Sequence, residues 1–451
     1  MIWVLITIVA EILGILSAIH AVMTTRTSQG AIAWMISLVT FPLVALPAYW
    51  ILGRSRFNGY VTAKKLSEEL MRDEHDDLSR ALAPHTPDVE SMGGAGKAIQ
   101  HLADLPFTTD NAVELLIDGA ATFDSVKAGV AAAKNYVLFQ FFIVHDDEIG
   151  RELKAALIAK AKEGVRVFFL FDEIGSHSLP AAFKQELTDA GVAVSAFNTR
   201  RGRGNRFQIN FRNHRKIVVT DGAAAWIGGH NVGDEYLGKD PKFGHWRDTH
   251  MKMVGPSALA AQVSFVVDWH WATGAEPGEL CWTPTAGAGD KAVLIVPSGP
   301  ADDYETATLM FLHAINTAEK RIWIASPYFV PDDSIINALR LAALRGVDVR
   351  VLIPDMPDHM MVYLAAFSYH AAATITGVKI HRYTHGFLHA KTMLVDDRVS
   401  AIGTANLDNR SLRLNFEITT LVVDEAFARE NERMFEADFA NARLMTAAEL
   451  N

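Results

Sequence analysis

Residues 214–231 read HRKIVVTDGAAAWIGGHN, and residues 389–406 read HAKTMLVDDRVSAIGTAN. The two stretches align without a gap at a constant offset of 175 residues. The alignment pairs identical residues at five polar or glycine positions: His214 with His389, Lys216 with Lys391, Asp221 with Asp396, Gly228 with Gly403, and Asn231 with Asn406. A single H-x-K-x4-D match arises easily by chance, but two matches in register within one chain indicate a shared functional site.

The sequence around each stretch alternates between strand-like and helical runs. The strand-like runs of the first half are AVELLID, YVLFQFFIV and VRVFFLFD, and those of the second half are AVLIVPSG, RIWIASPYFV and VDVRVLIP. Helical runs of similar length separate them, such as RELKAALIAKAKEG and SIINALRLAALRG. This order predicts βαβ units on a largely parallel sheet covered by helices, present twice in the chain.

The domain boundaries follow from the same repeat. The Gly- and Pro-containing stretch TGAEPGELCWTPTAGAGD separates the two copies. We expect the chain to divide into four segments: two transmembrane helices at 1–56, a linker or helical segment at 57–110, a first α/β domain at 111–275, and a second α/β domain at 290–451.

In both copies the H-x-K segment leads into a strand, so the imidazole and the ammonium two residues later share one face. The aspartate then ends the strand in a turn, and the glycine before the asparagine allows a close backbone approach. Two copies facing each other predict a pseudo-twofold cleft. Paired His, Lys and Asn side chains supply the nucleophile, the acid and the oxygen-binding groups that phosphodiester chemistry needs, without a metal or other cofactor.

Two acidic residues precede β-like runs at equivalent places in the copies. Asp248 lies 34 residues after His214, and Glu417 lies 28 residues after His389. Either carboxylate is a candidate to hold the rear nitrogen of an imidazole and fix its tautomer. A surface salt bridge is the alternative for each.

Two apolar runs of 22 residues, 2–23 and 31–52, open the chain. Each is long enough to cross a bilayer as a helix, and we expect a helical hairpin with the short turn TTRTSQG, its second helix kinked at Pro42 and Pro47. A signal peptide is the alternative for the first run, although that run lacks a basic n-region. The cations beyond the second run are Arg54, Arg56, Lys64 and Lys65, against Arg26 alone in the turn, which predicts both termini in the cytoplasm.

The formal charge of −10 argues against a nucleic-acid binder. One segment is nevertheless basic and contains no acid, with cations at Arg200, Arg201, Arg203, Arg206, Arg212, Arg215 and Lys216. It is a candidate site for anionic lipid, with a solvated loop face as the alternative. The single cysteine, Cys281, excludes an internal disulfide. We expect no metal site among the other histidines.

The paired motifs HRKIVVTD and HAKTMLVD, with their trailing GGHN and GTAN, resemble the HKD motifs of the phospholipase D superfamily. The phrases GGHNVGDEYLG, SPYFVPDD and GTANLDNRSLRLNFE, together with the N-terminal hairpin, are most similar to its bacterial cardiolipin synthase branch. The likeness covers roughly residues 111–445. It implies two phospholipase D-like α/β domains, each a mixed sheet flanked by helices, behind a transmembrane hairpin in the bacterial inner membrane.

The resemblance also implies a reaction, in which two phosphatidylglycerols give cardiolipin and glycerol through a phosphohistidine. His214 would be the nucleophile and His389 the acid, or the reverse. Lys216, Lys391, Asn231 and Asn406 would bind phosphoryl oxygens, and Asp221 and Asp396 would orient the site. The copies differ at His230, which stands where the second copy has Ala405.

Three alternatives remain open at this stage. A phospholipase D-type hydrolase or another phosphatidyltransferase would share every catalytic residue. A nuclease of the superfamily is disfavoured by the acidic balance and the anchor. A catalytically inactive membrane scaffold is disfavoured by intact His, Lys and Asp in both copies. The sequence leaves the oligomeric state open.

Overall fold

The computed structural model describes residues 1–53, 56–70, 72–88, 92–198, 200, 210–285, 287, 289–358, 360–446 and 449. The main strands of the first half are β1 (Thr108–Ile117), β2 (Tyr136–Phe141), β3 (Arg166–Asp172), β4 (Ala193–Phe197), β6 (Ile217–Thr220), β7 (Ala224–Gly228) and β9 (Thr249–Val254). Those of the second half are β10 (Lys291–Ser298), β11 (Arg321–Ala325), β13 (Asp348–Pro354), β14 (Lys379–Tyr383), β16 (Thr392–Val395), β17 (Val399–Gly403), β19 (Asn415–Val423) and β20 (Ala442–Leu444).

These strands form one continuous sheet in the order β20-β14-β13-β11-β16-β17-β19-β10-β1-β9-β7-β6-β2-β3-β4. The order from β10 outward to β14 repeats the order from β1 outward to β4. β1 joins the halves because it pairs antiparallel with β9 along most of its length and with β10 near its start. The structure therefore confirms a duplicated α/β fold with a mixed sheet.

Among the main strands, parallel pairing is confined to two groups of three, one in the outer part of each half. β2, β3 and β4 are parallel, as are β11, β13 and β14. The inner strands are antiparallel, because each motif stretch folds into a hairpin, β6–β7 or β16–β17. The expectation of a largely parallel sheet is therefore wrong for the inner strands. The division into domains at 111–275 and 290–451 stays a prediction.

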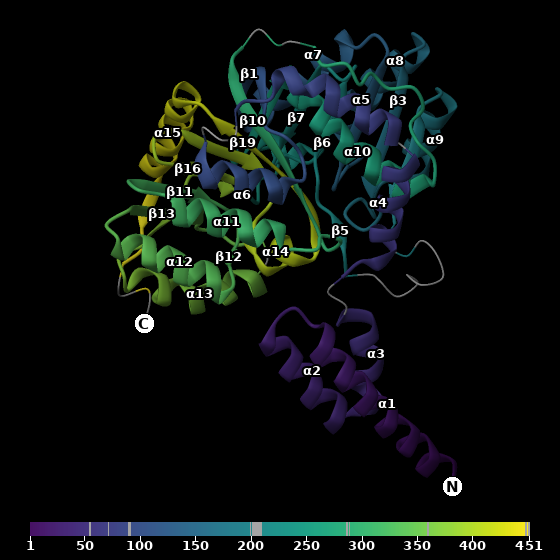
Figure 1. Ribbon diagram of the computed structural model, residues 1–451, viewed down its shortest axis with the longest axis vertical. Helices are drawn as coiled ribbons and strands as arrows, with labels where there is room; N and C mark the ends of the chain where they lie inside the picture. Colours follow the sequence, from purple (N-terminus) through teal and green to yellow (C-terminus); the bar gives the residue numbers. More distant parts are fainter. Residues whose placement is uncertain are drawn as a thin grey trace.

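Helices cover both faces of the sheet (Figure 1). In the first half, α7 (Asp118–Ala132), α8 (Glu148–Lys162) and α9 (Ala181–Asp189) pack on one face, and α4 (Asn58–Leu70) and α10 (Ser257–Thr273) lie against the other. In the second half, α6 (Gly93–Ala103), α11 (Thr306–Thr317) and α12 (Asp333–Leu344) lie opposite α15 (Glu425–Ala440). Alternate residues of each strand enter the two apolar layers, as the pleat requires.

The remaining elements are short or lie at the periphery. They are α5 (Arg72–Leu82), η1 (Ala83–His85), η3 (Asp234–Leu237), α13 (Met360–Thr374), α14 (Asn409–Arg413) and the two-residue strands β5 (Arg212–Asn213), β8 (Trp246–Arg247), β12 (Phe329–Val330), β15 (Phe387–Leu388) and β18 (Leu407–Asp408). Three of the two-residue strands connect the halves: β5 pairs with β19 of the second half, and β8 pairs with β15.

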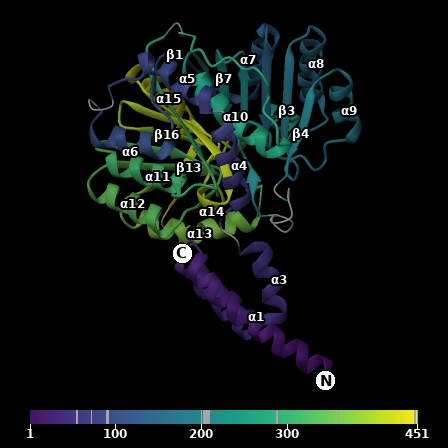
Figure 2. The same ribbon diagram turned by 45° about the vertical axis from the view of Figure 1, so that its right-hand side comes forward.

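The N-terminal helices project from the sheet as a separate arm (Figures 1 and 2). α1 (Ile2–Thr24) is apolar and long enough to cross a membrane. The second apolar run forms two helices, α2 (Ser28–Thr40) and α3 (Pro42–Leu52), with a break at Phe41. At 1.5 Å per residue they are about 20 Å and 17 Å long, each too short to cross a bilayer alone.

The chain reverses direction between α2 and α3. The rings of Trp34 and Tyr49 would lie about 22 Å apart in one continuous helix, but their centroids are 5.3 Å apart. The Gly14 backbone of α1 packs against this bend so closely that a Cβ there would lie 2.5 Å from the Leu38 oxygen. The second predicted span is therefore not a single helix, because Pro42 begins a new one in the opposite direction.

Candidate active site

The halves exchange short strands at the point where each histidine lies. β5 pairs in parallel with β19 of the second half, and the His214 amide donates to the Phe416 oxygen at 2.9 Å. β15 pairs in parallel with β8 of the first half, and the His389 amide donates to the Arg247 oxygen at 2.8 Å. Each histidine backbone is thus held by the half to which it does not belong.

The carboxylates are exchanged in the same way. Glu417 Oε2 lies 2.8 Å from His214 Nδ1, and Asp248 Oδ2 lies 2.6 Å from His389 Nδ1. Both carboxylates are fully buried. Since a buried carboxylate on Nδ1 selects the Nδ1–H tautomer, Nε2 of each ring remains available as a base or nucleophile.

Hydroxyl groups support Glu417 in a way that the sequence analysis missed. The Thr404 hydroxyl donates to Oε2 at 2.6 Å, and the Ser411 hydroxyl donates to Oε1 at 2.7 Å. The sequence contains a signal for these two hydroxyl groups. Thr404 replaces the second glycine of the GGHN segment, and Ser411 lies six residues before Glu417. In the first half, the residue that aligns with Thr404 is Gly229. Glycine is required there, since a Cβ on Gly229 would lie 2.0 Å from Asp248 Oδ1.

The two motif lysines are buried beside the histidines. Lys216 Nζ donates to the His214 oxygen at 2.6 Å, and Lys391 makes the same bond to the His389 oxygen. Burial lowers the pKa of both ammonium groups, that of Lys391 to about 8. Two buried cations this close to two imidazoles form an anion site.

Burial also lowers the pKa of His214 and of His389, to about 4 in each case. The paired carboxylate opposes this shift, while the lysines, including the lysine of the opposite half, add to it. Burial raises the pKa of Asp248, but Lys391, His230 and His389 outweigh it and hold that pKa well below its usual range. Both imidazoles are therefore neutral at pH 7 in the free protein.

The motif asparagine of the first half, Asn231, lies at the edge of this cluster. Asn231 accepts from the Ile143 amide at 3.2 Å and donates to the Tyr236 hydroxyl at 3.1 Å. The Tyr236 ring lies 6.3 Å from the His389 ring, which places Asn231 beside the histidines. Asn406 Oδ1 is buried with no hydrogen-bond partner in the described part of the chain.

The structure does not bring Asp221 and Asp396 to the histidines. The Asp221 carboxylate accepts from three consecutive backbone amides, those of residues 134–136, and the Asp396 carboxylate accepts from those of residues 319–321. Asp221 is five residues beyond Lys216 along an extended strand, a distance of about 17 Å. The predicted orienting role is therefore corrected: both aspartates fasten the turn after the motif strand to the start of β2 or β11.

The basic segment is also corrected in part. Arg215 is buried under the sheet and pairs with Asp268 at 2.9 Å, because strand alternation directs it away from His214 and Lys216, so it is not a lipid-binding residue. Arg200 pairs with Glu173, and Arg212 is half-buried. Arg201, Arg203 and Arg206 lie outside the described residues.

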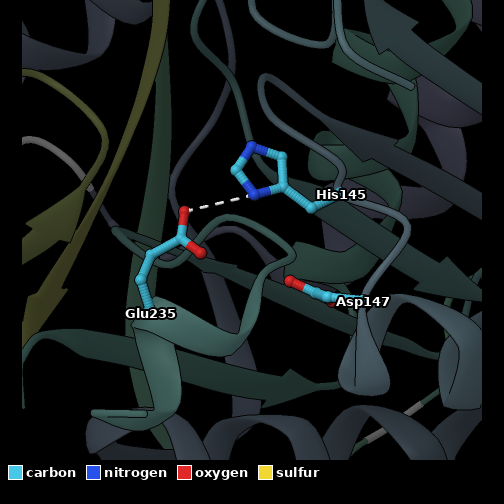
Figure 3. A group of neighbouring side chains, drawn as sticks. All are labelled: His145, Asp147 and Glu235. Atoms are coloured by element: carbon cyan, nitrogen blue, oxygen red, sulfur yellow. Dashed lines mark ion pairs between the residues drawn. The ribbon is translucent and has the colours of Figure 1, made fainter. Parts of the chain in front are cut away.

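One group in the described part of the chain has ligand atoms close enough for a metal, within 4.8 Å of one another: His145, Asp147 and Glu235 (Figure 3). Both oxygens of Asp147 already accept backbone amides, one from Gly150 at 3.0 Å and one from Asp234 at 2.7 Å. The carboxylate thereby caps α8 and ties it to η3, which is a structural role.

Comparison with known proteins identifies the arrangement. Residues 127–241 and 311–439 match the family described as cardiolipin synthase, PLD-like domain. The chain is 51% identical to cardiolipin synthase A of Pseudomonas entomophila (strain L48) over 443 residues, covering 97% of this chain and 92% of that protein. It is 50% identical over 444 residues to the protein of the same name from Pseudomonas fluorescens (strain SBW25), with the same coverage.

Solved structures support the fold. Phosphatidylserine synthase from Haemophilus influenzae Rd KW20 superposes with a TM-score of 0.58 at 17% identity, covering 78% of this chain and 92% of that chain. Given the duplicated fold, the paired histidines and relatives about half identical over nearly the whole length, the chain belongs to the cardiolipin synthase family of phospholipase D-like proteins and is a phosphatidyltransferase.

Proposed function

We propose that the protein makes cardiolipin and free glycerol from two molecules of phosphatidylglycerol. The observation that carries the proposal is the pair of imidazoles, each with Nδ1 on a buried carboxylate, beside two buried lysines. A phosphodiester bound by the lysines has a nitrogen available on either side for in-line displacement.

We assign His214 as the nucleophile and His389 as the acid. In the first step His214 Nε2 bonds to phosphorus, the bond from phosphorus to the glycerol oxygen breaks, and His389 Nε2–H protonates the departing glycerol. In the second step His389 takes the proton from a hydroxyl of the second phosphatidylglycerol. That oxygen bonds to phosphorus, the phosphorus–nitrogen bond breaks, and His214 is regenerated.

The acid histidine acquires its proton when substrate binds. Both pKa values are about 4 in the free protein because of burial. The negative phosphodiester brings a charge of opposite sign beside the imidazoles and offsets part of the lysine charge, which raises the pKa of an imidazolium. Lys216, Lys391, Asn231 and Asn406 are the groups we assign to the phosphoryl oxygens.

The membrane arm supports a lipid substrate. The protein is membrane-associated, with one N-terminal helix long enough to span. We propose that it lies in the bacterial cytoplasmic membrane with both catalytic halves on the cytoplasmic side. Arg26, Arg56, Lys64 and Lys65 all lie at the end of the arm near the catalytic halves, which agrees with the positive-inside rule. Because Arg26 follows α1 directly, we place the beginning of α1 on the opposite side of the membrane, in place of the expected hairpin with both termini in the cytoplasm.

The test uses purified full-length protein in detergent with phosphatidylglycerol and a chelator. We expect cardiolipin and glycerol in equal amounts; phosphatidic acid alone would assign a hydrolase instead. A p-nitrophenyl phosphatidyl ester separates the histidines, since its leaving group needs no acid. His389→Ala should release a burst of nitrophenol with this ester, and His214→Ala should release none. Equal bursts from both variants would refute the assignment.

A further inference from the structure

A pair of side chains beside the histidines has no role in the mechanism above. His145 Nδ1 lies 3.5 Å from Glu235 Oε1, and both residues are partly exposed, 36% and 21% of their side-chain surface (Figure 3). The hydrogen bond to Glu235 raises the pKa of His145. The pair thus offers a carboxylate and an imidazole to solvent, in contrast to the buried lysines.

Strand alternation places this pair on the face of the phosphate-binding Asn231. Val144 and Val232 form a parallel bridge and both enter the core, so His145 and Asn231 point to the opposite face. The Glu235 carboxylate lies over the next residue on that face, since a Cβ on Gly233 would lie 2.6 Å from Oε2. The pair is therefore next to the site, on the side where Tyr236 approaches His389.

No equivalent pair is present in the part of the second half that the structure describes. The parallel bridge of Phe329 with Leu407 matches that of Val144 with Val232, so the counterparts of His145 and Glu235 are Val330 and Arg410. Arg410 donates to the Asn210 side chain and backbone oxygen. The halves share their histidines, lysines and asparagines but differ in charge at this position.

We infer that His145 and Glu235 form a subsite for the glycerol headgroup. A carboxylate accepts hydrogen bonds from neighbouring hydroxyls, while the imidazole adds a donor, so the pair fits the adjacent hydroxyls of a glycerol group. The subsite lies on the His389 side, where glycerol departs. By microscopic reversibility the acceptor glycerol enters at the same place, so one subsite serves both steps.

This inference rests on the proposed function, but its test does not need cardiolipin to be made. The phosphatidyl-enzyme formed from the p-nitrophenyl ester is offered glycerol and ethanol together, with a chelator present. The ratio of phosphatidylglycerol to phosphatidylethanol measures the choice of acceptor after the common intermediate. It is independent of the fraction of active protein, so a partly misfolded variant still reports it.

We expect Glu235→Gln and His145→Ala each to lower this ratio about tenfold, because ethanol lacks the second and third hydroxyls. Asp146→Asn is the matched control: it removes a neighbouring carboxylate of similar exposure, paired with Arg151, and should leave the ratio unchanged. An unchanged ratio in both subsite variants would overturn the inference. So would a metal requirement for the wild-type preference, which would make the pair a cation site.

Failure of the proposed function would give a different experimental result from failure of the subsite inference. Wild-type protein that forms phosphatidylglycerol from glycerol but no cardiolipin from phosphatidylglycerol would refute cardiolipin synthesis. The glycerol-to-ethanol ratios of the variants would still decide the subsite in that case.

Discussion

At the scale of single residues, the two motif aspartates have a structural role, unlike the histidines and lysines of the same motifs. Each one accepts backbone amides at the far end of its strand and has a positive φ, 54° for Asp221 and 51° for Asp396. Asparagine tolerates this left-handed conformation and keeps one acceptor oxygen, so Asp→Asn is a mild probe at both positions.

We expect Asp221→Asn and Asp396→Asn to lower the free energy of unfolding by about 1–3 kcal/mol each, the cost of weakening hydrogen bonds to a charged group. The turnover of the folded fraction should change little, because the carboxylates do not reach the substrate. Thermal unfolding and kcat, measured on the same preparations, check this. A loss of kcat of a hundredfold or more with unchanged stability would contradict it.

The pH dependence of kcat/KM follows from the buried titrating groups. With the p-nitrophenyl ester, whose leaving group needs no proton from His389, the first step depends on neutral His214. The pKa of His214 is lowered to about 4, so protonation should reduce kcat/KM for this ester only as the pH falls towards 4. Lys391 must be charged, and its pKa of about 8 predicts a second loss as the pH rises above 8. A loss of kcat/KM with its midpoint near pH 6.5 would contradict the predicted effect of His214 protonation.

A variant tests the predicted loss of kcat/KM above pH 8 separately. Lys391→Arg keeps its charge to much higher pH, because guanidinium groups are not deprotonated in proteins. Whatever its absolute rate, this variant should lose a smaller share of its kcat/KM above pH 8 than the wild type does. The loss that remains reports Lys216, whose pKa burial also lowers.

At the scale of elements, Gly229, the residue after β7, allows the end of the first central hairpin to pass over a carboxylate. A Cβ at Gly229 would lie 2.0 Å from Asp248 Oδ1, so Gly229→Ala must displace the group that orients His389. We expect a loss of activity of about a hundredfold or more, comparable to the loss of an orienting acid.

Gly94→Ala is the control for this substitution, since a Cβ there meets no atom within 4 Å. It should retain wild-type activity. Wild-type kcat in Gly229→Ala, measured with the same substrate, would show that the close approach has no bearing on His389.

The elements also show what a sequence can and cannot predict here. The motif hairpins and their residues were predictable because one pattern occurs twice at a constant offset. Asp248 and Glu417 were predictable as candidates from their positions before β-like runs, but their exchange between halves depends on β5 meeting β19 and β15 meeting β8. Pairing of two-residue strands far apart in the chain leaves no periodic signal.

The second apolar run was misjudged for a related reason. Its hydropathy is continuous, and a proline commonly only kinks a membrane helix. The reversal at Phe41 depends on tertiary contacts of Tyr49 with Trp34 and of Gly14 with Leu38, which composition does not reveal.

At the scale of the whole molecule, the orientation in the membrane is testable with the one cysteine of the chain. Cys281 is exposed in the segment between the halves. In sealed spheroplasts a membrane-impermeant maleimide should leave it unlabelled, and in inverted vesicles or after detergent it should react fully. Labelling in intact spheroplasts would place the catalytic halves on the outer side. Cys281→Ser gives the background for both preparations.

The exchange of carboxylates has a consequence for genetics. A lesion at Glu417, encoded in the second repeat, disables the histidine of the first, and a lesion at Asp248 disables the histidine of the second. A gene segment that encodes only one repeat therefore encodes a histidine without the carboxylate that orients it. Compensating substitutions for a damaged histidine environment should be sought in the opposite repeat, about two hundred codons away for His214 and its partner acid.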